Sequence, residues 1–403
     1  MNNFAEDWRG WKTRRIAEVA VIRSGGTPDR KIAAYWSGDI PWVTTREVCY
    51  KTIRGTSESI TRRGLDNSSA KLFPPGTVLT ALYGQGKTRG QVARLGIGAA
   101  TNQACAAILP NPDLDPDYLF YYLEHQYLPL RNLSNAGGQA NLSAEILANF
   151  PIILPPLSEQ RRIAAILGTW DAAIEKAERL TRLAADALSA RRILLLSARH
   201  NRKRSEWRTV TFGDVTEELT SRNGNFLTAT SVMGVIKGDG FQPMRERTIG
   251  SDLSRYKVVP PSAFAYNPMR LNIGSLAFSG FTTDILVSPD YVVFAAKGNA
   301  CAPEFLNEVR QSSRWAAWCQ QGGAGSVRTR IYYGDLISMP IDLPPLATQK
   351  RITAILADLT TRHRTAVRRV ELLRRQKTGL MERLLTGKIR VPEAAAKLSP
   401  AAD

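Results

Sequence analysis

A stretch of 14 residues occurs twice in this chain. It reads LPPLSEQRRIAAIL from Leu154 to Leu167 and LPPLATQKRITAIL from Leu343 to Leu356, 189 positions later. After each Pro-Pro pair, apolar residues recur in steps of three, four or seven, which is the spacing of an amphipathic helix. The offset of 189 residues is too long for a solenoid of short repeats, so it indicates a duplicated unit that consists of a domain and a helix.

Each copy predicts where a long helix begins and what it packs against. Proline cannot continue a helix, so each Pro-Pro pair ends the preceding strand, and Ser158 and Thr348 are the expected N-caps. The apolar spacing favours a coiled-coil seam, and a twofold relation between the repeats makes the two helices antiparallel. The alanines thin this seam, so packing of a single apolar face on a domain stays an alternative. The residues expected to pair the helices are Ile163, Ile166, Trp170, Ile174, Ile352, Ile355, Leu359 and Val370.

The repeat divides the 403 residues into an α+β protein with two strand-rich domains and two long helices. Trp11-Lys12-Thr13 and Trp207-Arg208-Thr209 open the two domains in a similar way, whereas the domain interiors match poorly. This pattern suits two related domains that read different things. The expected segments are a first domain at 1–152, a helix at 153–199, a second domain at 200–341, a helix at 342–390 and a disordered tail at 391–403.

Apolar runs between glycines and prolines predict the strands of both domains. Helices are expected at 118–127 and 303–318. The strands are expected at 77–83, 92–94, 104–109, 258–266, 275–278 and 291–295.

The charge of the chain predicts a polyanionic partner. There are 54 Lys and Arg against 36 Asp and Glu, a net charge of +18, and a folded protein of this charge usually meets nucleic acid. The alternative is a basic chain that offsets an acidic partner subunit. Because phosphate neutralisation dominates DNA affinity, the cations of the loops are the candidate DNA contacts: Arg30, Lys31, Arg46, Arg62, Arg63, Lys87, Arg89, Arg222, Arg245, Arg247, Arg270, Arg328 and Arg330.

Cysteine, histidine and hydropathy patterns exclude several other classes. The cysteines Cys49, Cys105, Cys301 and Cys319 have no paired spacing, so we expect buried thiols in a reducing cytoplasm. The histidines lie far apart and form no ligand-spaced motif, so we expect no metal site. The polar N-terminus and the lack of a long apolar run argue against a signal peptide and a membrane span.

One segment imitates a nucleotide-binding motif. Ala81 to Thr88 reads ALYGQGKT, a loose phosphate-loop pattern with alanine at its first glycine position. A true phosphate loop runs from a strand into a helix, but RGQVA follows here and starts a strand, so a basic turn between strands is the better interpretation. The sequence has no methyltransferase cofactor loop, since Asn267-Pro268-Met269-Arg270 only partly matches the amino-methylating motif, and no serine elbow or nuclease carboxylate cluster. We therefore expect no catalytic residues.

Taken together, these motifs resemble the specificity subunit of type I restriction-modification enzymes. The resemblance rests on Ser24-Gly25-Gly26-Thr27-Pro28, Tyr35-Trp36, Asp39-Ile40-Pro41-Trp42-Val43, Thr101-Asn102-Gln103-Ala104-Cys105, the two LPPL helix starts and Leu384-Leu385-Thr386-Gly387-Lys388-Ile389-Arg390. It covers nearly the whole chain, although the second domain lacks the SGGTP-like loop.

The resemblance implies a non-catalytic subunit with two target-recognition domains, each reading one half of a split double-stranded DNA target. It implies that the paired helices set the spacer and dock two modification (methyltransferase) subunits, and that restriction subunits join them. S-adenosylmethionine, ATP and Mg are then expected on those partner subunits and no cofactor in this chain. The competing hypotheses are a fused methyltransferase or ATPase, which would bind S-adenosylmethionine or ATP by itself, and a coiled-coil scaffold, which would bind only proteins.

Overall fold

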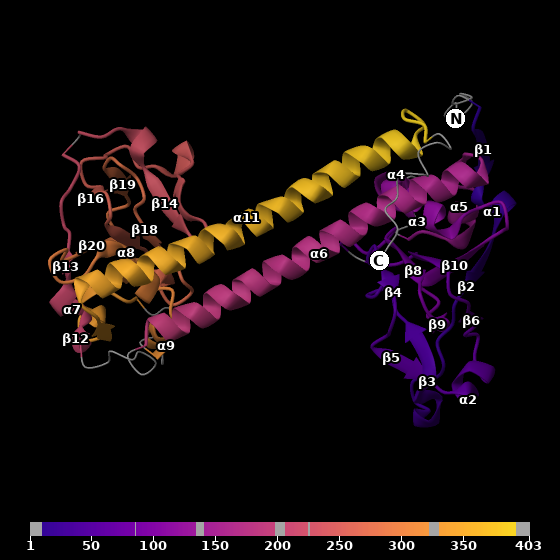
Figure 1. Cartoon of the computed structure of the whole chain (residues 1–403), viewed down its shortest axis with the longest axis horizontal. Helices are drawn as coiled ribbons and strands as arrows, with labels where there is room; N and C mark the ends of the chain where they lie inside the picture. The colour runs from indigo at the N-terminus through magenta and orange to yellow at the C-terminus, as the bar shows by residue number, and fades with distance from the viewer. Residues whose placement is uncertain are drawn as a thin grey trace. The chain divides into compact units, whose positions relative to one another are not determined.

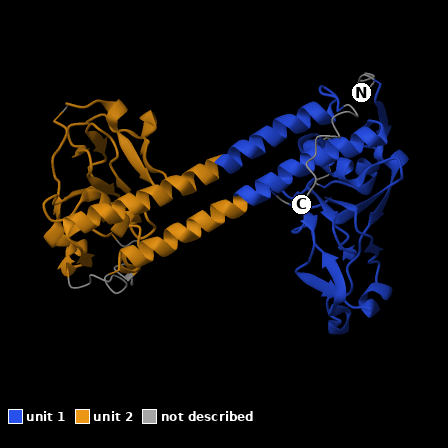
Figure 2. Cartoon of the chain, in the orientation of Figure 1, with its two compact units in different colours: residues 1–177, 369–403 blue, residues 178–368 orange. Residues whose placement is uncertain are grey.

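The computed structural model describes residues 10–84, 86–133, 141–197, 206–224, 226–321 and 330–391. The chain forms two compact units: unit 1 is Met1–Ala177 with Arg369–Asp403, and unit 2 is Glu178–Arg368 (Figure 2). Both divisions fall inside the two long helices, α6 (Leu157–Leu195) and α11 (Leu346–Leu385). Each unit therefore consists of one globular part and parts of both helices.

The globular part of unit 1 contains two mixed sheets (Figure 1). Five strands, in the order β2-β10-β7-β8-β4, make the frame sheet, and four strands, in the order β5-β3-β9-β6, make a second sheet that we call the distal sheet. The frame sheet holds β2 (Ala20–Ser24), β4 (Thr52–Ile53), β7 (Val78–Ala81), β8 (Val92–Leu95) and β10 (Cys105–Pro110). The distal sheet holds β3 (Trp36–Val43), β5 (Glu58–Ile60), β6 (Leu72–Phe73) and β9 (Ala99–Thr101).

Short elements connect these sheets to α6. β1 (Lys12–Arg15) pairs antiparallel with β11 (Pro151–Leu154), so the two ends of the globular part meet immediately before α6. The remaining elements of unit 1 are α1 (Ile16–Val19), η1 (Ala33–Tyr35), α2 (Arg62–Asp66), α3 (Pro116–His125), α4 (Tyr127–Leu133) and α5 (Ala144–Ala148).

Unit 2 repeats the frame with fewer strands. Its frame sheet has the order β13-β20-β17-β18, and β12 (Arg208–Thr211) pairs with β21 (Pro340–Leu343) as β1 does with β11. The frame strands are β13 (Thr216–Glu218), β17 (Phe264–Tyr266), β18 (Leu276–Phe278) and β20 (Val292–Ala296). Two separate pairs replace the distal sheet: β14 (Met233–Ile236) with β15 (Gly240–Pro243), and β16 (Lys257–Val259) with β19 (Ile285–Val287). The helical elements are α7 (Phe212–Val215), η4 (Ala229–Ser231), η5 (Glu246–Thr248), η6 (Pro268–Arg270), α8 (Pro303–Val309), α9 (Ser313–Gln321) and α10 (Tyr333–Leu336).

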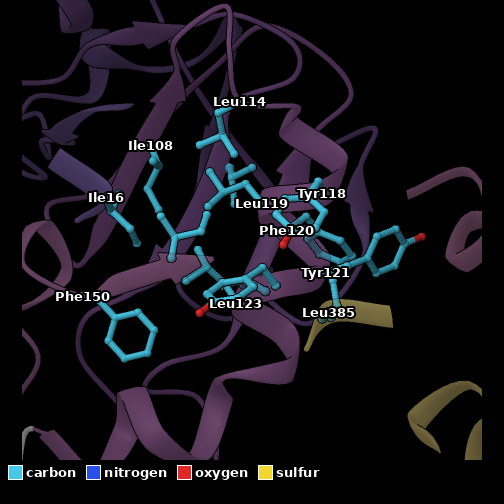
Figure 3. Close-up of a cluster of buried hydrophobic side chains, with 14 of the residues drawn as sticks. Ile16, Ile108, Leu114, Tyr118, Leu119, Phe120, Tyr121, Leu123, Phe150 and Leu385 are labelled. Atoms are coloured by element: carbon cyan, nitrogen blue, oxygen red, sulfur yellow. The ribbon is translucent and has the colours of Figure 1, made fainter. Parts of the chain in front are cut away.

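The main core of unit 1 joins α3 to the frame sheet and to both long helices. Figure 3 shows Leu385 of α11 near Tyr121 and Leu123 of α3, and all three side chains are buried. Ile163 and Leu167, at the start of α6, belong to the same cluster. The corresponding core of unit 2 contains Ile352 and Leu356 at the start of α11, with Leu188 from the later part of α6.

A buried glutamine occupies one of the identical positions of the two repeats. Gln160 accepts a hydrogen bond from the Asp115 backbone N–H (2.9 Å) and donates to the carbonyls of Asp113 (3.1 Å) and Pro155 (2.9 Å). Its partner in unit 2, Gln349, accepts from Ala302 N–H (2.7 Å) and donates to the carbonyls of Ala300 (3.1 Å) and Pro344 (2.8 Å). Because buried backbone groups must be paired, this amide fixes each long helix to the loop before α3 or α8.

The fold class agrees with the prediction: mixed sheets, two long helices and a repeated frame. Within unit 1 the helices are antiparallel, because Asp171 of α6 meets Lys377 of α11 at 2.7 Å while the earlier Glu159 meets the later Arg390 at 2.7 Å.

Three local predictions were wrong. The helices begin at Leu157 and Leu346, so Ser158 and Thr348 lie inside them, and the carbonyls of Pro156 and Pro345 accept the first N–H groups instead. The strand expected at 258–266 is interrupted at Pro260-Pro261-Ser262, where Ser262 has φ 63°. The helix expected at 303–318 is two helices, because the Ser312 hydroxyl accepts from Trp315 N–H (3.2 Å) and starts α9.

Candidate nucleic-acid interface

The distal sheet of unit 1 is attached to the frame sheet through the glycine loop that follows β2. A Cβ atom on Gly25 would lie 2.1 Å from the Thr101 hydroxyl, and one on Gly26 would lie 2.3 Å from the Ala70 nitrogen. Gly26 N–H donates to the Thr101 carbonyl (2.8 Å). Only glycine allows this approach, so the SGGTP motif is a structural joint between the sheets. Figure 1 shows β3, β5 and α2 on the side of the globular part away from α6.

Arg30 lies directly after this joint. Its guanidinium carbon is 3.8 Å from the centre of the Trp36 ring, and its Nη1 is 2.7 Å from the Glu58 carboxylate. The side chain is still 54% exposed. Trp36 contacts Trp42 edge to face, with ring centres 5.1 Å apart. An exposed arginine therefore lies over an aromatic surface.

Three further predicted cations belong to the same part of unit 1. Lys31 is exposed beside Arg30, and Arg62 and Arg63 are exposed on α2. Thr61, the N-cap of α2, donates its hydroxyl to the Ala34 carbonyl (2.8 Å), and its N–H donates to the Tyr35 carbonyl (2.9 Å). These bonds attach α2 to η1. Arg62 pairs with Asp66 at 3.0 Å on the same helix, a contact of small energetic value at an exposed site.

The segment that imitates a phosphate loop is a braced hairpin. β7 and β8 are antiparallel neighbours on either side of it, so a strand follows the loop and the phosphate-loop interpretation is excluded. Tyr127 of α4 donates its hydroxyl to the Lys87 carbonyl (2.8 Å), and Arg131 donates to the Arg89 carbonyl (3.2 Å). The Lys87 side chain is exposed, and that of Arg89 is half-buried.

Arg46 belongs with this hairpin. It is exposed in the turn that follows β3. That turn reaches Tyr50, whose N–H donates to the Val92 carbonyl (2.7 Å) and whose ring lies 6.0 Å from that of Tyr127. Unit 1 therefore gathers its predicted cations in two groups, one around the Arg30 loop and one around the β7–β8 hairpin.

Unit 2 has a cavity of about 290 Å³ that one predicted cation lines, and two further predicted cations are neighbours of its lining residues. Arg330 lines the cavity, Arg222 forms a β-bridge with the lining residue Lys257, and Arg270 follows the lining residue Met269. The cavity is mixed in charge, because Glu218 and Asp290 also line it. Arg222 donates to the Arg255 carbonyl (2.7 Å), and Arg330 donates to the Tyr332 hydroxyl (3.4 Å), which raises the pKa of Arg330.

Two more predicted cations of unit 2 lie away from the lining residues of this cavity. Arg245 and Arg247 are exposed around η5, and Arg328 lies outside the described residues.

Sequence reasoning missed Lys257 and the role of the tryptophans. Burial lowers the pKa of Lys257, which donates to the Tyr291 carbonyl (2.7 Å) at the wall of the cavity. A lysine that opens the apolar run Lys257-Val258-Val259 was the available signal. For Arg30, the signal was a Trp-x₅-Trp spacing in an eight-residue strand, which places both rings beside one loop.

The residues expected to pair the long helices divide into two kinds. Ile163 and Ile352 are buried in the cores of their units, Ile166 and Leu359 pack against those cores, and Val370 is buried. Trp170 and Ile174 are half-buried, and Ile355 is 41% exposed. The first turns of each helix therefore use the apolar face to pack on a globular part, which is the alternative that the thin seam left open.

Two groups of charged side chains hold α11 and the residues after it to the rest of unit 1. Lys377 is 2.7 Å from Asp171 and 3.2 Å from Glu124. Burial raises the pKa of Glu124, and Lys377 partly offsets this. Glu159 accepts from the Trp11 indole (3.3 Å), from Arg390 (2.7 Å) and from Val391 N–H (3.1 Å). Burial opposes the ionised form of Glu159, but these donors outweigh it and lower its pKa.

The cysteine prediction needs one correction. Cys105, Cys301 and Cys319 are buried free thiols, and burial raises the pKa of Cys105 to about 12, but Cys49 is exposed. Cys49 follows β3 in the turn of Arg46, where a side chain can point to solvent. Among the described residues, no three His, Cys, Asp or Glu side chains are grouped as metal ligands, and no described helix is long and apolar enough to cross a membrane.

Comparison with known proteins agrees with the predicted resemblance. Residues 9–185 match the family model of the type I restriction modification DNA specificity domain. The chain is 28% identical over 175 residues to the type I restriction enzyme MjaIX specificity subunit of Methanocaldococcus jannaschii, which covers 41% of this chain and 39% of that protein. It is 27% identical over 175 residues to the EcoR124I/EcoR124II specificity subunit of Escherichia coli, covering 42% of each. The matches thus span about two fifths of the length of these curated relatives.

Solved structures extend the likeness in fold to nearly the whole chain. The S subunit of a type I restriction-modification system from M. genitalium superposes with a TM-score of 0.59 at 14% identity, covering 95% of this chain and 97% of that one. A chain from a study of complex assembly and conformational transition of the type I R-M system superposes with a TM-score of 0.55 at 18% identity, covering 94% and 99%.

Proposed function

We propose that this chain, whose residues 9–185 match the family model of the type I restriction modification DNA specificity domain, is the DNA-recognition subunit of a type I restriction-modification complex. Each unit reads one half of a split DNA target, and the chain itself carries out no reaction. The observation that carries the proposal is the repeated frame: two globular parts built on the same order of frame strands are each followed by a long helix, and each presents its own set of exposed cations.

The surfaces of the two units suit different halves of a target. The cations of unit 1 lie around the Arg30 loop and the β7–β8 hairpin, whereas in unit 2 Arg330 lines a cavity that also holds carboxylates. Phosphate contacts position a protein on DNA, whereas contacts to base edges specify the sequence. Two frames with different additions can therefore bind the same backbone and read different bases.

The long helices set the unread spacer in this proposal. α6 has 39 residues, and at 1.5 Å per residue such a helix is roughly 58 Å long. One turn of DNA is about 34 Å, so a helix of this length is on the scale of a target whose halves lie about one turn apart.

The partners are proposed from the resemblance to type I specificity subunits. Two modification subunits dock on the helices and bring S-adenosylmethionine, and restriction subunits bring ATP and Mg to the assembled complex. The exposed apolar residues Leu180 and Leu183 of α6 and Leu372 of α11, which are 52%, 55% and 46% exposed, are candidates for this docking. The free cysteines suit the reducing cytoplasm in which such a complex acts.

Selection of bound DNA tests this proposal. The chain is purified with its modification subunit and mixed with random duplex DNA, and the bound fraction is sequenced at two salt concentrations. The proposal expects a two-part motif with a fixed gap, and affinity that falls steeply with salt because phosphate contacts release counterions. Binding without any sequence preference would favour the protein scaffold, and S-adenosylmethionine or ATP binding by the isolated chain would favour an enzyme.

A further inference from the structure

Arg30 differs from the other predicted cations in how firmly it is oriented. Its guanidinium lies 3.8 Å from the centre of the Trp36 ring and 4.9 Å from that of Trp42. The Trp36 indole donates to the carbonyl of Asp29 (3.1 Å), the residue before Arg30, and the Trp42 indole donates to the carbonyl of Gly26 (3.0 Å). Both indole rings are thus hydrogen-bonded to the loop that carries Arg30. These bonds restrain the rings relative to the guanidinium.

Glu58 is the ion-pair partner of the guanidinium. Its carboxylate lies 2.7 Å from Nη1. Among the described residues, the other two nitrogens of Arg30, Nε and Nη2, have no hydrogen-bond partner, and 54% of the side chain is exposed. Nε and Nη2 form the side-on fork of an arginine, whose two parallel N–H groups match a pair of acceptors in one plane.

This arrangement suits a base edge better than a phosphate. A phosphate contact gains from net positive charge and tolerates many side-chain orientations, so a neighbouring carboxylate would only weaken it. A base contact needs the plane of the guanidinium to coincide with the plane of the base, and it gains from a side chain that is ordered before binding. Glu58 reduces the local charge and increases the order, which is the combination that base reading requires.

Guanine is the base whose edge this fork fits. In the major groove, guanine presents O6 and N7 as two adjacent acceptors, whereas adenine and cytosine each present an amino donor that would meet the N–H groups. We propose that Arg30 reads the guanine of one G·C pair in the half-site bound by unit 1, and that Trp36 and Glu58 are positioning residues for it. This inference rests on the proposed DNA-recognition function.

The test is a modified-base map of genomic DNA from cells that express the modification subunit with the wild-type chain or a variant. Arg30→Ala is expected to make one G·C position of one half-site degenerate, with a roughly 10- to 100-fold loss of discrimination at that position. Arg30→Lys, which keeps the charge but not the fork, is expected to relax the same position. Glu58→Gln and Trp36→Leu are expected to relax that position to a smaller extent, because the fork remains but is less well oriented.

Arg62→Ala is the matched control. Arg62 is an exposed arginine in the same part of unit 1 and also has a carboxylate partner, but no aromatic ring lies under it in the described structure. It is expected to retain every base of the motif and to lower the extent of modification evenly at all sites, as the loss of a phosphate contact would. The half-site read by unit 2 provides the internal control for folding, since a motif that keeps this half shows an intact complex.

The outcomes separate the two proposals. No two-part motif with the wild-type chain would overturn the proposed function itself. A wild-type motif whose halves contain no G·C pair, or a motif that Arg30→Ala leaves unchanged at every position, would overturn the role of Arg30 and leave the proposed function standing. Uniform loss of modification with unchanged bases would show that Arg30 is a phosphate contact, and would overturn the inference as well.

Discussion

In unit 1 the frame strands follow the order β2-β10-β7-β8, and in unit 2 the order β13-β20-β17-β18 places the corresponding strands in the same succession. In each unit a short strand before the frame, β1 or β12, pairs with the strand that immediately precedes a long helix, β11 or β21. In each unit a buried glutamine also attaches that helix to the globular part. The frames carry different additions: a four-stranded distal sheet in unit 1, and two separate strand pairs in unit 2.

The difference shows which interactions the repeat preserves. Gln160, Ile163 and Leu167 have identical partners in the second copy, and all six side chains are buried against their own globular part. By contrast, Glu159, which binds Arg390 and the Val391 N–H in unit 1, corresponds to Thr348 in the second copy. The repeat therefore preserves the attachment of each helix to its frame, whereas the additions to the two frames differ.

The largest expected effect comes from the buried glutamines. Gln160→Ala and Gln349→Ala each leave one N–H and two carbonyl groups without their partner, so each is expected to lower the free energy of unfolding by about 3 kcal/mol. The comparison of the two units predicts similar losses. Urea denaturation of the two variants and of Gln376→Ala, an exposed control on α11, measures them. A loss of stability in only one of the two variants would contradict the expectation that both glutamines stabilise their units in the same way.

A smaller effect is expected at Lys377. Lys377→Met leaves Glu124 and Asp171 close together without their cation, but Asp171 is 39% exposed and can be hydrated. We expect a loss of about 2 kcal/mol, confined to unit 1. A companion change, Glu124→Gln, is expected to recover part of the loss in the double variant, and additive losses in this double-mutant cycle would contradict the direct pairing.

Glu159 is expected to give a pH-dependent effect of about 1 kcal/mol. Because the pKa of Glu159 is lower in the folded state, the stability it contributes is present above its unfolded pKa and is lost as the pH falls through the folded pKa. The difference in unfolding free energy between wild type and Glu159→Gln, about 1 kcal/mol at pH 7, should shrink as the pH is lowered below about 4.3. A difference that does not depend on pH would show that the carboxylate charge is not what clamps Arg390.

The smallest effect on stability, with a clear effect on function, is expected from longer helices. One heptad inserted after Ala177 and one after Arg368, the points where the compact units divide, lengthens each helix by roughly 10 Å. This corresponds to about three base pairs. Mapping of modified bases should show a longer spacer and unchanged half-sites, and an unchanged spacer would refute the role of the helices in setting it.

The sequence predicted the fold best where the same packing interaction occurs in both halves of the chain. The duplicated LPPL starts predicted the long helices and the division into two related halves, because packing of each helix on its frame demands the same buried residues twice. Local signals also located most frame strands. They failed at Pro260-Pro261-Ser262, where a single apolar run hides a turn, and at Ser312, where a capping serine divides a run that looks like one helix.

The candidate site was harder to predict because it depends on tertiary contacts. Thirteen cations were equivalent in the sequence, and only the structure shows that Arg30 lies on Trp36 and that Arg330 lines a cavity. No local pattern indicates that Glu58, which is 28 positions away, would orient Arg30. The net charge of +18 predicted a polyanionic partner. The contacts in the structure then distinguish Arg30 from the other cations.

A map of modified bases in genomic DNA tests the central claim most directly. It compares cells that carry the modification subunit with this chain against cells that carry the modification subunit alone. A methylated motif in two parts with a fixed gap, present only with this chain, is the predicted result and gives the target of each unit. A motif that persists without this chain would assign sequence reading to another subunit and contradict the account.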